Sequence, residues 1–325
     1  MQAIRFHTIG GPDVLKLEEV EKPHPGAGEA LVRIHVAGVN FADTLFRRGR
    51  YARQPQFPET PGFEAAGVVE EVGEGVAGAL VGRRVTTLGG QHCYAEYTVA
   101  PAEQLIFLPD KLSLEAGAAF PIQSLTAYHM LYTVDQVKPG MSVLVHAAAG
   151  GVGLQAVQMA KQAGARVFGT TSTEEKAKLA REMGADEVIL YNKVDFAERI
   201  KNLTEGRGVD LVLDSVGRAT FAGNLKCLAP LGHVILYGIA SGSPEPVNIM
   251  ASLFERSLKV SAFYLFTLSQ RPEVAREGIQ RVISWITDDK LKIVIGLKLP
   301  LAQAAEAHRK MEGRETVGKI LLTVN

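Results

Sequence analysis

The residues best suited to chemistry form a glycine-rich stretch, AAAGGVG, at positions 147–153. It follows a run rich in Val and Leu, 142–146, and precedes an amphipathic segment that ends at Gly164. A strand, a glycine turn and a helix in this order bind a pyrophosphate, because the glycines let backbone N–H groups approach it and the helix N-terminus carries partial positive charge. We therefore predict a dinucleotide site that includes Gly150, Gly151, Val152 and Gly153. The alternative is that these glycines serve only a tight turn and close packing.

The segment after the next predicted strand bears on which dinucleotide is bound. Sites for NAD usually place Asp or Glu about 20 residues after the glycine turn, where the carboxylate binds the ribose 2′-hydroxyl. Here the strand ends in TTST, and no carboxylate appears before Glu174. The hydroxyls of Thr171 and Ser172 and the cation of Lys176 suit a 2′-phosphate, so we predict NADPH rather than NADH. The alternative is that Lys176 and its neighbours form the solvated first turn of a helix and bind no phosphate.

The elements that would position these residues alternate regularly. Strands are expected near 142–147, 165–170, 187–191, 209–214, 231–238 and 258–264, and helices near 152–163, 174–183, 194–204 and 217–229. Such alternation predicts right-handed crossovers and a doubly wound parallel sheet, the Rossmann arrangement of an α/β protein.

The first part of the chain has a different pattern. Short runs rich in Val, Ile and Thr, separated by Gly and Pro turns, predict strands at 1–6, 14–20, 29–39, 64–72, 83–88 and 95–100. This pattern is typical of an antiparallel barrel-like or sandwich domain. After a helix at 113–131 and the alternating region, a helix (272–286), a strand (292–297), a helix (301–311) and a strand (318–324) are expected. We predict domains at 1–122 and 123–266, with 267–325 returning to the first.

Composition excludes several classes of function. The formal charge is zero, from 35 basic and 35 acidic residues, which predicts no nucleic-acid or anionic membrane partner. Two cysteines, Cys93 and Cys227, are too few for a disulfide framework or a four-cysteine zinc site. No signal peptide is recognisable, and no apolar run approaches the ~18 residues needed to cross a bilayer. We expect a cytoplasmic, two-domain protein.

Four separated motifs carry a family resemblance that spans essentially the whole chain. They are AAAGGVG after VLVH, DSVG at 214–217, GVNFADT at 38–44 and PGFEAAGVV at 61–69. They resemble the medium-chain dehydrogenase/reductase superfamily and, within it, the zinc-free quinone oxidoreductases that include zeta-crystallin. The resemblance implies a GroES-like, mostly-β catalytic domain, a Rossmann domain that binds NADPH, a returning C-terminal segment and a homodimer.

The same resemblance predicts that no zinc is bound. Zinc-dependent members have a Gly-His-Glu motif whose histidine ligates zinc, and an earlier cysteine ligand. Here the matching tripeptide contains Phe63, and the earlier position falls in Gly38-Val39-Asn40. His92 and Cys93 are adjacent and therefore poorly placed to share one tetrahedral site, so we interpret them as strand residues.

Further cofactor contacts follow from the resemblance and from the expected topology. Ligands of such sheets bind beyond the carboxyl ends of the strands. The resemblance implies that Tyr191, which ends the third strand, helps hold the 2′-phosphate. It also implies that the ends of the fourth and fifth strands line the nicotinamide; these residues are Ser215, Tyr237, Gly238, Ile239 and Ala240. The alternative for Gly217 and Gly238 is that they serve turn geometry alone, although a glycine can serve a turn and contact the cofactor as well. We further expect Phe263 and Tyr264 to flank the nicotinamide and Thr126 to bond its carboxamide.

Hydride transfer without zinc requires another way to activate the acceptor. A quinone is already electrophilic, so placed hydrogen bonds to its oxygens suffice. Asn40 and Tyr51 match polar positions that face the nicotinamide in the resembled family, and we predict that both contact the acceptor. Turn stabilisation by Asn40 and loop packing by Tyr51 are the alternatives. Asp43 and Glu64 are interpreted as structural, and Leu45 or Phe46 replaces a second tyrosine often found in the family, which makes the pocket more apolar.

Three functions are compatible with these residues. The first is an NADPH-dependent quinone reductase. The second is an NADPH-dependent reductase of activated C=C bonds, such as enones or acrylates. The third is an NADPH-binding protein without turnover, as in a lens-crystallin role. The apolar segment 258–266 would lie at the sheet edge, where it invites pairing with a second chain.

Overall fold

A computed structural model describes residues 1–89 and 92–324. The chain divides into two units: Met1–Ile122 together with Ile293–Asn325, and Gln123–Lys292. The sequence predicts that the returning segment begins at residue 267, but residues 267–292 belong to the second unit, and the return begins at Ile293. Helix α7 (Pro272–Thr287) explains this difference, because its Trp285 packs against Tyr128 and Tyr132, both residues of the second unit.

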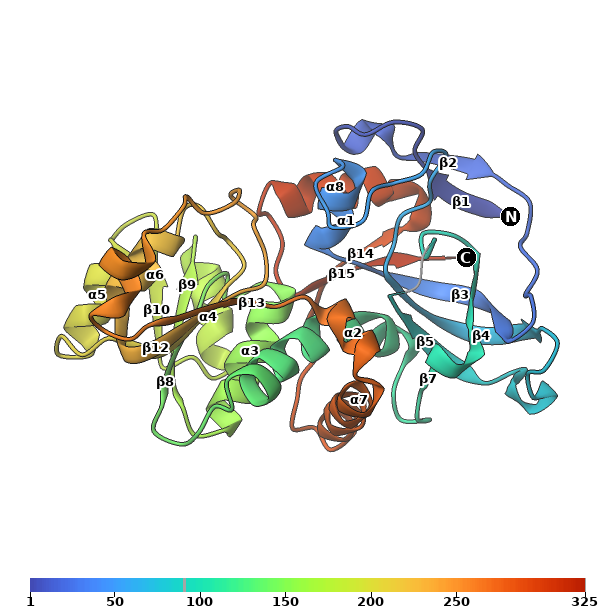
Figure 1. Ribbon diagram of the computed structural model, residues 1–325. Helices are drawn as coiled ribbons and strands as arrows, with labels where there is room; N and C mark the ends of the chain where they lie inside the picture. Colours follow the sequence, from blue (N-terminus) through green and yellow to red (C-terminus); the bar gives the residue numbers. More distant parts are fainter. Residues whose placement is uncertain (90–91, 325) are drawn as a thin grey trace. The chain divides into compact units, whose positions relative to one another are not determined.

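The second unit is built on the predicted doubly wound parallel sheet (Figure 1). Its strands run in the order β10-β9-β8-β11-β12-β13, all parallel. They are β8 (Ser142–Val145), β9 (Arg166–Thr171), β10 (Glu187–Leu190), β11 (Val209–Asp214), β12 (Leu228–Leu236) and β13 (Lys259–Ala262). The order reverses between β8 and β11, and this is the position at which such sheets bind their ligands.

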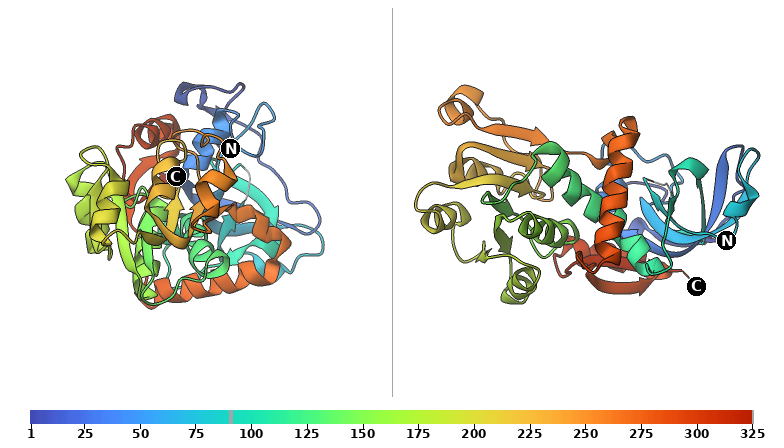
Figure 2. Two further views of the ribbon diagram at one scale, coloured as in Figure 1. Left: turned by 60° about the vertical axis from the view of Figure 1, so that its left-hand side comes forward. Right: turned by 90° about the horizontal axis from the view of Figure 1, so that it is seen from below.

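Helices cover both faces of this sheet (Figure 2). They are α3 (Gly151–Gln162), α4 (Glu174–Glu182), α5 (Phe196–Leu203) and α6 (Phe221–Cys227). Helices α5 and α6 share a core with the sheet that includes Phe168, Val212 and Leu225. The predicted helix at 217–229 ends earlier, at Cys227, and β12 begins at Leu228 rather than near residue 231.

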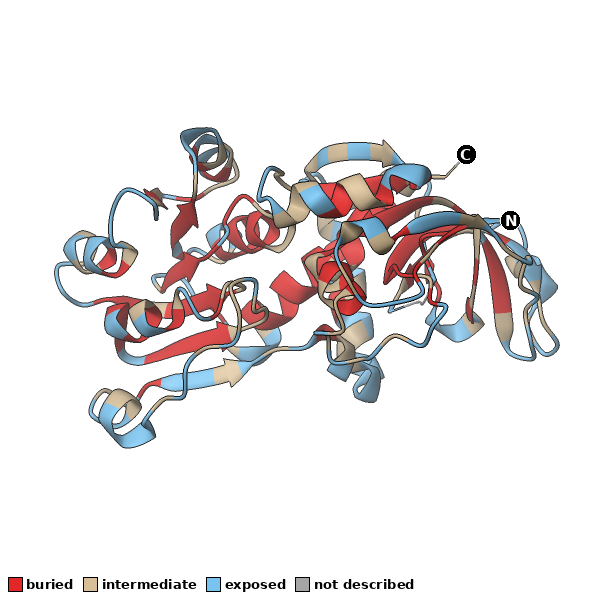
Figure 3. Cartoon of the chain, turned by 90° about the horizontal axis from the view of Figure 1, so that it is seen from above, coloured by how far each residue is buried: buried red, intermediate tan, exposed pale blue. Residues whose placement is uncertain are grey.

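The first unit contains a mostly antiparallel sheet in the order β14-β15-β3-β4-β5-β7, with β6 also paired to β3. Its strands are β3 (Glu29–Val39), β4 (Glu64–Val72), β5 (Arg84–Leu88), β6 (Tyr97–Pro101), β7 (Ile106–Phe107), β14 (Ile295–Pro300) and β15 (Lys319–Thr323). A separate hairpin joins β1 (Gln2–Arg5) to β2 (Lys16–Glu19). Buried residues gather on the strands of both sheets and, in the second unit, also along α3 (Figure 3).

The last strand of the chain is inserted beside the long strand β3. Ile320 of β15 is opposite Val39 of β3 in an antiparallel register, which carries Lys319 to the end of β3. Directly after β3, helix α1 (Phe41–Arg47) begins, a helix that the sequence did not predict. Helices α2 (Leu114–Tyr128) and α8 (Ala304–Glu312) complete the set used below. Among the described residues, no helix is long and apolar enough to span a membrane.

Candidate active site

The predicted glycine turn lies at the carboxyl end of β8 and leads into α3. Gly150 precedes the first helical residue, and among the described residues no side chain caps this end of the helix. A Cβ on Gly153 would lie 2.3 Å from the carbonyl oxygen of Ala147, so only glycine allows the helix to start this close to the turn. The N–H groups of Gly151, Val152 and Gly153 precede the first helical hydrogen bond, and such groups are suited to bind a phosphate.

The residues predicted to select NADPH come together at the ends of β9 and β10. The N–H of Tyr191 donates to the carbonyl oxygen of Thr171 at 3.2 Å, which brings the two strand ends side by side. Thr171 is buried and its hydroxyl donates to the carbonyl oxygen of Thr173 at 3.3 Å, whereas Ser172 is half-buried and Tyr191 is exposed. Lys176 lies in the first turn of α4, where its N–H donates to the Thr173 hydroxyl.

Among the described residues, those that end and follow β9, from Thr170 to Thr173, are all hydroxyl-bearing and none is acidic. The first acidic residue after this strand is Glu174, and its carboxylate is bound by Arg181 at 2.6 Å. A 2′-phosphate would therefore meet hydroxyls and a lysine rather than a carboxylate at the strand end. The phosphate-binding role of these residues stays a prediction.

The ends of β11 and β12 are held against each other at close range. The N–H of Tyr237 donates to the carbonyl oxygen of Asp214 at 2.9 Å, and that of Ala240 donates to Ser215 at 3.0 Å. A Cβ on Gly238 would lie 2.8 Å from the Ser215 carbonyl oxygen, so glycine is required here. Burial raises the pKa of Tyr237 to about 12, while the Ser215 side chain acts in the opposite direction. Ile239, in the same turn, is half-buried.

The three remaining predicted cofactor residues lie on other elements of the second unit. The N–H of Phe263 donates to the Leu236 carbonyl oxygen at 2.8 Å, which places Phe263 directly after β13 and beside the end of β12. Tyr264 is 42% exposed and its ring packs on Phe266. Thr126 is buried on α2, and within the described residues no hydrogen bond joins it to the strand-end residues.

A buried polar network beneath the glycine turn was missed by sequence reasoning. The His146 ring bonds the Thr170 hydroxyl at 2.9 Å and the Asn224 side chain at 2.7 Å. Asn224 in turn donates to Asp214, whose other oxygen accepts the N–H groups of Val216 and Gly217. Burial lowers the pKa of His146, so its neutral form is favoured. The network ties β8, β9 and β11 together behind the predicted cofactor residues.

In the first unit, Asn40 belongs to a buried cluster with Glu64 and Lys319. The Asn40 amide donates to Glu64 Oε1 at 2.8 Å and accepts from Lys319 Nζ at 2.7 Å. Lys319 also forms an ion pair with Glu64, whose second oxygen accepts the N–H of Ile122 at 2.8 Å. Lys319 was not among the predicted site residues, because only the pairing of β15 with β3 brings it to Asn40.

Tyr51 lies close to the same cluster through Phe63. The two rings pack at 5.2 Å between centroids, and Phe63 directly precedes Glu64 in the chain. Phe63 also packs on Phe46, which is 1% exposed and therefore part of the core. Leu45 and Phe46 were the two candidates for the position at which the family often has a second tyrosine. Leu45 is half-buried, whereas Phe46 is fully buried.

A second buried network supports α1. The Asp43 carboxylate accepts the backbone N–H of Asn40 at 2.7 Å and the Tyr94 hydroxyl at 3.1 Å. The Tyr94 hydroxyl is also hydrogen-bonded to Nε2 of His308 on α8 at 3.2 Å, and Nδ1 of the same histidine is hydrogen-bonded to Arg47. Burial raises the pKa of Asp43 to about 7 and, together with the nearby arginines, lowers the pKa of His308 to about 3.

The two residues considered as metal ligands have separate partners. His92 contacts Glu59 and the Thr60 carbonyl oxygen, whereas the Cys93 sulfur contacts the Thr87 hydroxyl. Burial raises the pKa of Cys93 to about 12, which disfavours the thiolate that binds metals. Within residues 1–89 and 92–324, no cluster of three or more His, Cys, Asp or Glu side chains is arranged to hold a metal ion.

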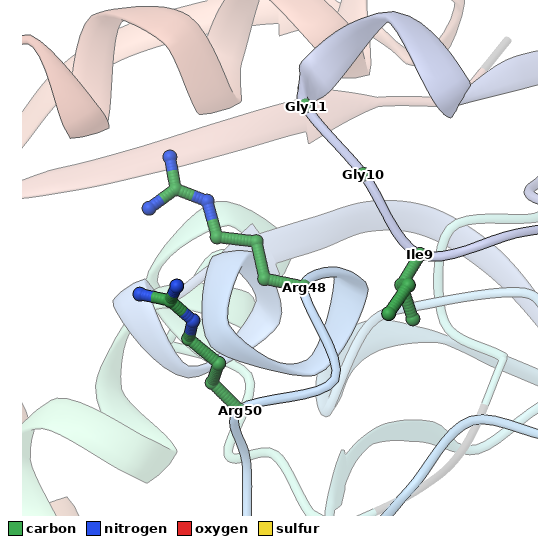
Figure 4. A pocket seen from close by; sticks show the side chains of 5 residues that line it. All are labelled: Ile9, Gly10, Gly11, Arg48 and Arg50. Atoms are coloured by element: carbon green, nitrogen blue, oxygen red, sulfur yellow. The ribbon is translucent and has the colours of Figure 1, made fainter.

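A surface pocket of about 260 Å³ lies at the end of α1, lined by Ile9, Gly10, Gly11, Arg48 and Arg50 (Figure 4). Both arginine side chains extend toward the same region. Arg48 is paired with Glu312 at 2.7 Å, while no ion pair involves Arg50 in the part of the chain that the structure describes. The pocket therefore offers positive charge one residue before Tyr51.

Comparison with known proteins identifies relatives along the whole chain. Residues 26–110 match the alcohol dehydrogenase GroES-like domain and residues 151–284 match the family described as zinc-binding dehydrogenase. A 2-haloacrylate reductase from a Burkholderia species is 41% identical, covering 99% of this chain and 98% of the relative. A quinone oxidoreductase from Pseudomonas aeruginosa is 38% identical, covering 98% of both chains. The crystal structure of Escherichia coli quinone oxidoreductase complexed with NADPH superimposes with a TM-score of 0.95 at 37% identity, covering 99% of this chain and 100% of that one.

Proposed function

The chain belongs to the quinone oxidoreductase family of the medium-chain dehydrogenase/reductase superfamily, and we propose that it reduces quinones with NADPH. Similarity over nearly the full length to quinone oxidoreductases, including one complexed with NADPH, carries this proposal. When bound, NADPH supplies a hydride, and a quinone that accepts this hydride and one proton becomes a hydroquinone.

Two close backbone approaches in the second unit support the proposed dinucleotide site. Gly153 and Gly238 stand where a Cβ would collide with backbone, so the chain at both positions is shaped for close approach. We propose that the N-terminus of α3 holds the pyrophosphate and that Thr171, Ser172, Lys176 and Tyr191 hold the 2′-phosphate. Ser215 and the β12 end would then line the nicotinamide, with Phe263, Tyr264 and Thr126 around it.

The first unit supplies the acceptor contacts in this proposal. Asn40 and Tyr51 would donate hydrogen bonds to the quinone oxygens, where negative charge develops as the hydride arrives. The half-buried Leu45 adds apolar surface that suits an aromatic acceptor. We therefore propose that residues 1–122 form the catalytic domain and that the sheet of the second unit binds the cofactor.

The direct test is NADPH oxidation, followed by absorbance, with 1,2-naphthoquinone and 9,10-phenanthrenequinone. We expect turnover with at least one of them and weaker turnover with NADH. Tight NADPH binding without turnover by a broad acceptor panel would contradict an enzymatic role and favour a cofactor-binding protein.

A second candidate function is reduction of an acrylate-type acid. Two observations favour it: the Burkholderia relative is a 2-haloacrylate reductase, and Arg50, which lines the surface pocket and forms no ion pair within the described residues, offers a charge that a carboxylate would bind. Product analysis separates the two functions, because an acrylate would be converted to a saturated acid while a quinone would yield a hydroquinone. Saturation of 2-chloroacrylate at a rate comparable with quinone reduction would establish this second activity.

We also propose that the protein is a homodimer paired through β13. This strand is the last in its sheet, and its Val260 is 38% exposed. Nearby in the sequence, Ile249, Met250 and Phe254 are each more than 60% exposed, an amount of apolar surface that pairing would cover. A cytoplasmic location is proposed as well, because Cys93 and Cys227 are both free, buried thiols, as fits a reducing compartment.

A further inference from the structure

The amide of Asn40 is held between two opposite charges. Lys319 Nζ donates to Asn40 Oδ1 at 2.7 Å, and Asn40 Nδ2 donates to Glu64 Oε1 at 2.8 Å. Rotating the amide by 180° would place its NH₂ group against the ammonium and its oxygen against the carboxylate, and both contacts would be repulsive. The two charges therefore select one orientation of the amide.

We propose that Lys319 and Glu64 are positioning residues that fix the Asn40 amide so that its second N–H is presented to the acceptor. The inference rests on the proposed function, in which Asn40 donates to a quinone oxygen. An amide nitrogen has two N–H groups, and Glu64 takes one of them. In the described parts of the chain the other forms no hydrogen bond, and Asn40 keeps 9% of its surface exposed.

The surroundings of the ion pair are those of a built site. Glu64 is 0% exposed and Lys319 2% exposed, so their charges act on Asn40 with little screening by water. The second Glu64 oxygen is held by the N–H of Ile122, which fixes the carboxylate. A Cβ on Gly38 would lie 2.7 Å from Glu64 Oε1, so glycine keeps open the space that the carboxylate occupies.

The backbone of Asn40 is fixed independently of its side chain. The Asp43 carboxylate accepts the Asn40 N–H at 2.7 Å and thereby caps the start of α1. With the backbone anchored, the side-chain torsions of Asn40 are its remaining freedom, and the contacts with Lys319 and Glu64 hold its amide in one orientation. A buried pair used only for stability would not need to contact both polar ends of the amide.

The experiment compares Lys319→Met, Lys319→Arg and the double variant Glu64→Gln/Lys319→Met with the wild-type protein. We expect Lys319→Met to lower kcat for quinone reduction about tenfold to hundredfold, the range typical of a misplaced catalytic group, with the Kd for NADPH within twofold of wild type. Lys319→Arg should recover part of the loss. Lys298→Met, which removes an exposed lysine from β14, is the matched control and should leave kcat unchanged.

The double variant separates positioning from stability, because it leaves no buried unpaired charge. We expect it to recover the melting temperature lost in Lys319→Met but to keep the low kcat. Recovery of kcat together with melting temperature would overturn the proposal and leave the pair a structural role only.

A second readout decides the matter without turnover. In wild-type protein the two side-chain amide protons of Asn40 should have well-separated NMR shifts, because one faces a carboxylate. The separation between the two shifts should shrink in the double variant. A separation equal to that of the wild type would also overturn the proposal. If the wild type reduces no quinone, the proposed function fails, and the NMR comparison still tests the positioning of the amide.

Discussion

At the scale of single residues, Lys176 is the side chain on which we propose the choice of cofactor most depends. It lies in the first turn of α4, next to the end of a strand that carries no carboxylate. A charge-assisted contact to a phosphate contributes about 1.5–3 kcal/mol. Lys176→Ala should therefore raise the Kd for NADPH on the order of tenfold or more while changing the Kd for NADH little, as measured by fluorescence titration.

A matched control for this prediction lies two residues along the same helix. Lys178 is exposed and its contact is with Glu182, within α4. Lys178→Ala should leave both dissociation constants unchanged. Equal weakening of NADPH and NADH binding by Lys176→Ala would remove the lysine from the 2′-phosphate site.

The buried Asp43 carboxyl is expected to make the stability of the protein depend on pH. Burial raises its pKa from 3.8 to about 7, so between these values the folded protein holds a proton that the unfolded chain has lost. Stability from this group is complete below about pH 4 and is lost as the pH rises to about 7. Roughly three pKa units at 1.36 kcal/mol each correspond to an effect on the order of 4 kcal/mol.

Asp43→Asn should abolish this contribution, because asparagine does not titrate. The pKa values of His129 and His308 are lowered to about 4 and about 3 by burial, so their contribution to stability rises with pH. This rise overlaps the pH range in which the contribution of Asp43 falls. The quantity to measure is therefore the difference in free energy of unfolding between variant and wild type, from urea titrations at pH 5 and pH 7.5. The variant should gain stability relative to wild type at the higher pH; an equal difference at both pH values would contradict the assignment.

At the scale of elements, the junction of β8, the glycine turn and α3 leaves no space for a side chain at Gly153. Gly153→Ala would place a Cβ 2.3 Å from the Ala147 carbonyl oxygen, which forces the start of α3 away from the turn. We expect NADPH binding to weaken at least tenfold in calorimetric titration while circular dichroism shows the fold retained. Gly78→Ala, at a position with open space around it, is the control and should bind NADPH normally.

The sequence located the parallel sheet well because each of its strands alternates with a helix. Buried runs such as 142–146 and amphipathic helices such as α3 repeat a clear period. Helix α1 was missed because its seven residues are too few for that signal, and its start is fixed by a carboxylate three residues on. Lys319 was missed for another reason: it lies 279 positions from Asn40, and only the register of β15 on β3 joins them.

At the scale of the whole molecule, one edge of the second unit differs from the other. Strand β13 ends the sheet on one side. Val260 lies on this strand and Phe254 precedes it, and both are exposed. Leu231 is 70% exposed and lies beside the segment before β13, because its N–H donates to the Arg256 carbonyl oxygen at 2.9 Å. Strand β10 ends the other side, and Val194 follows it with 49% exposed surface.

Pairing of two chains through β13 predicts that charge at this edge separates them. Val260→Asp in each chain would set two carboxylates against each other across the paired strands and leave strand N–H and carbonyl groups facing water. Light scattering after size-exclusion chromatography should give twice the 35.0 kDa chain mass for wild type and the single mass for the variant. Val194→Asp, which adds the same charge beyond the opposite edge, should remain dimeric. A dimer that survives Val260→Asp but not Val194→Asp would place the interface at the β10 edge instead.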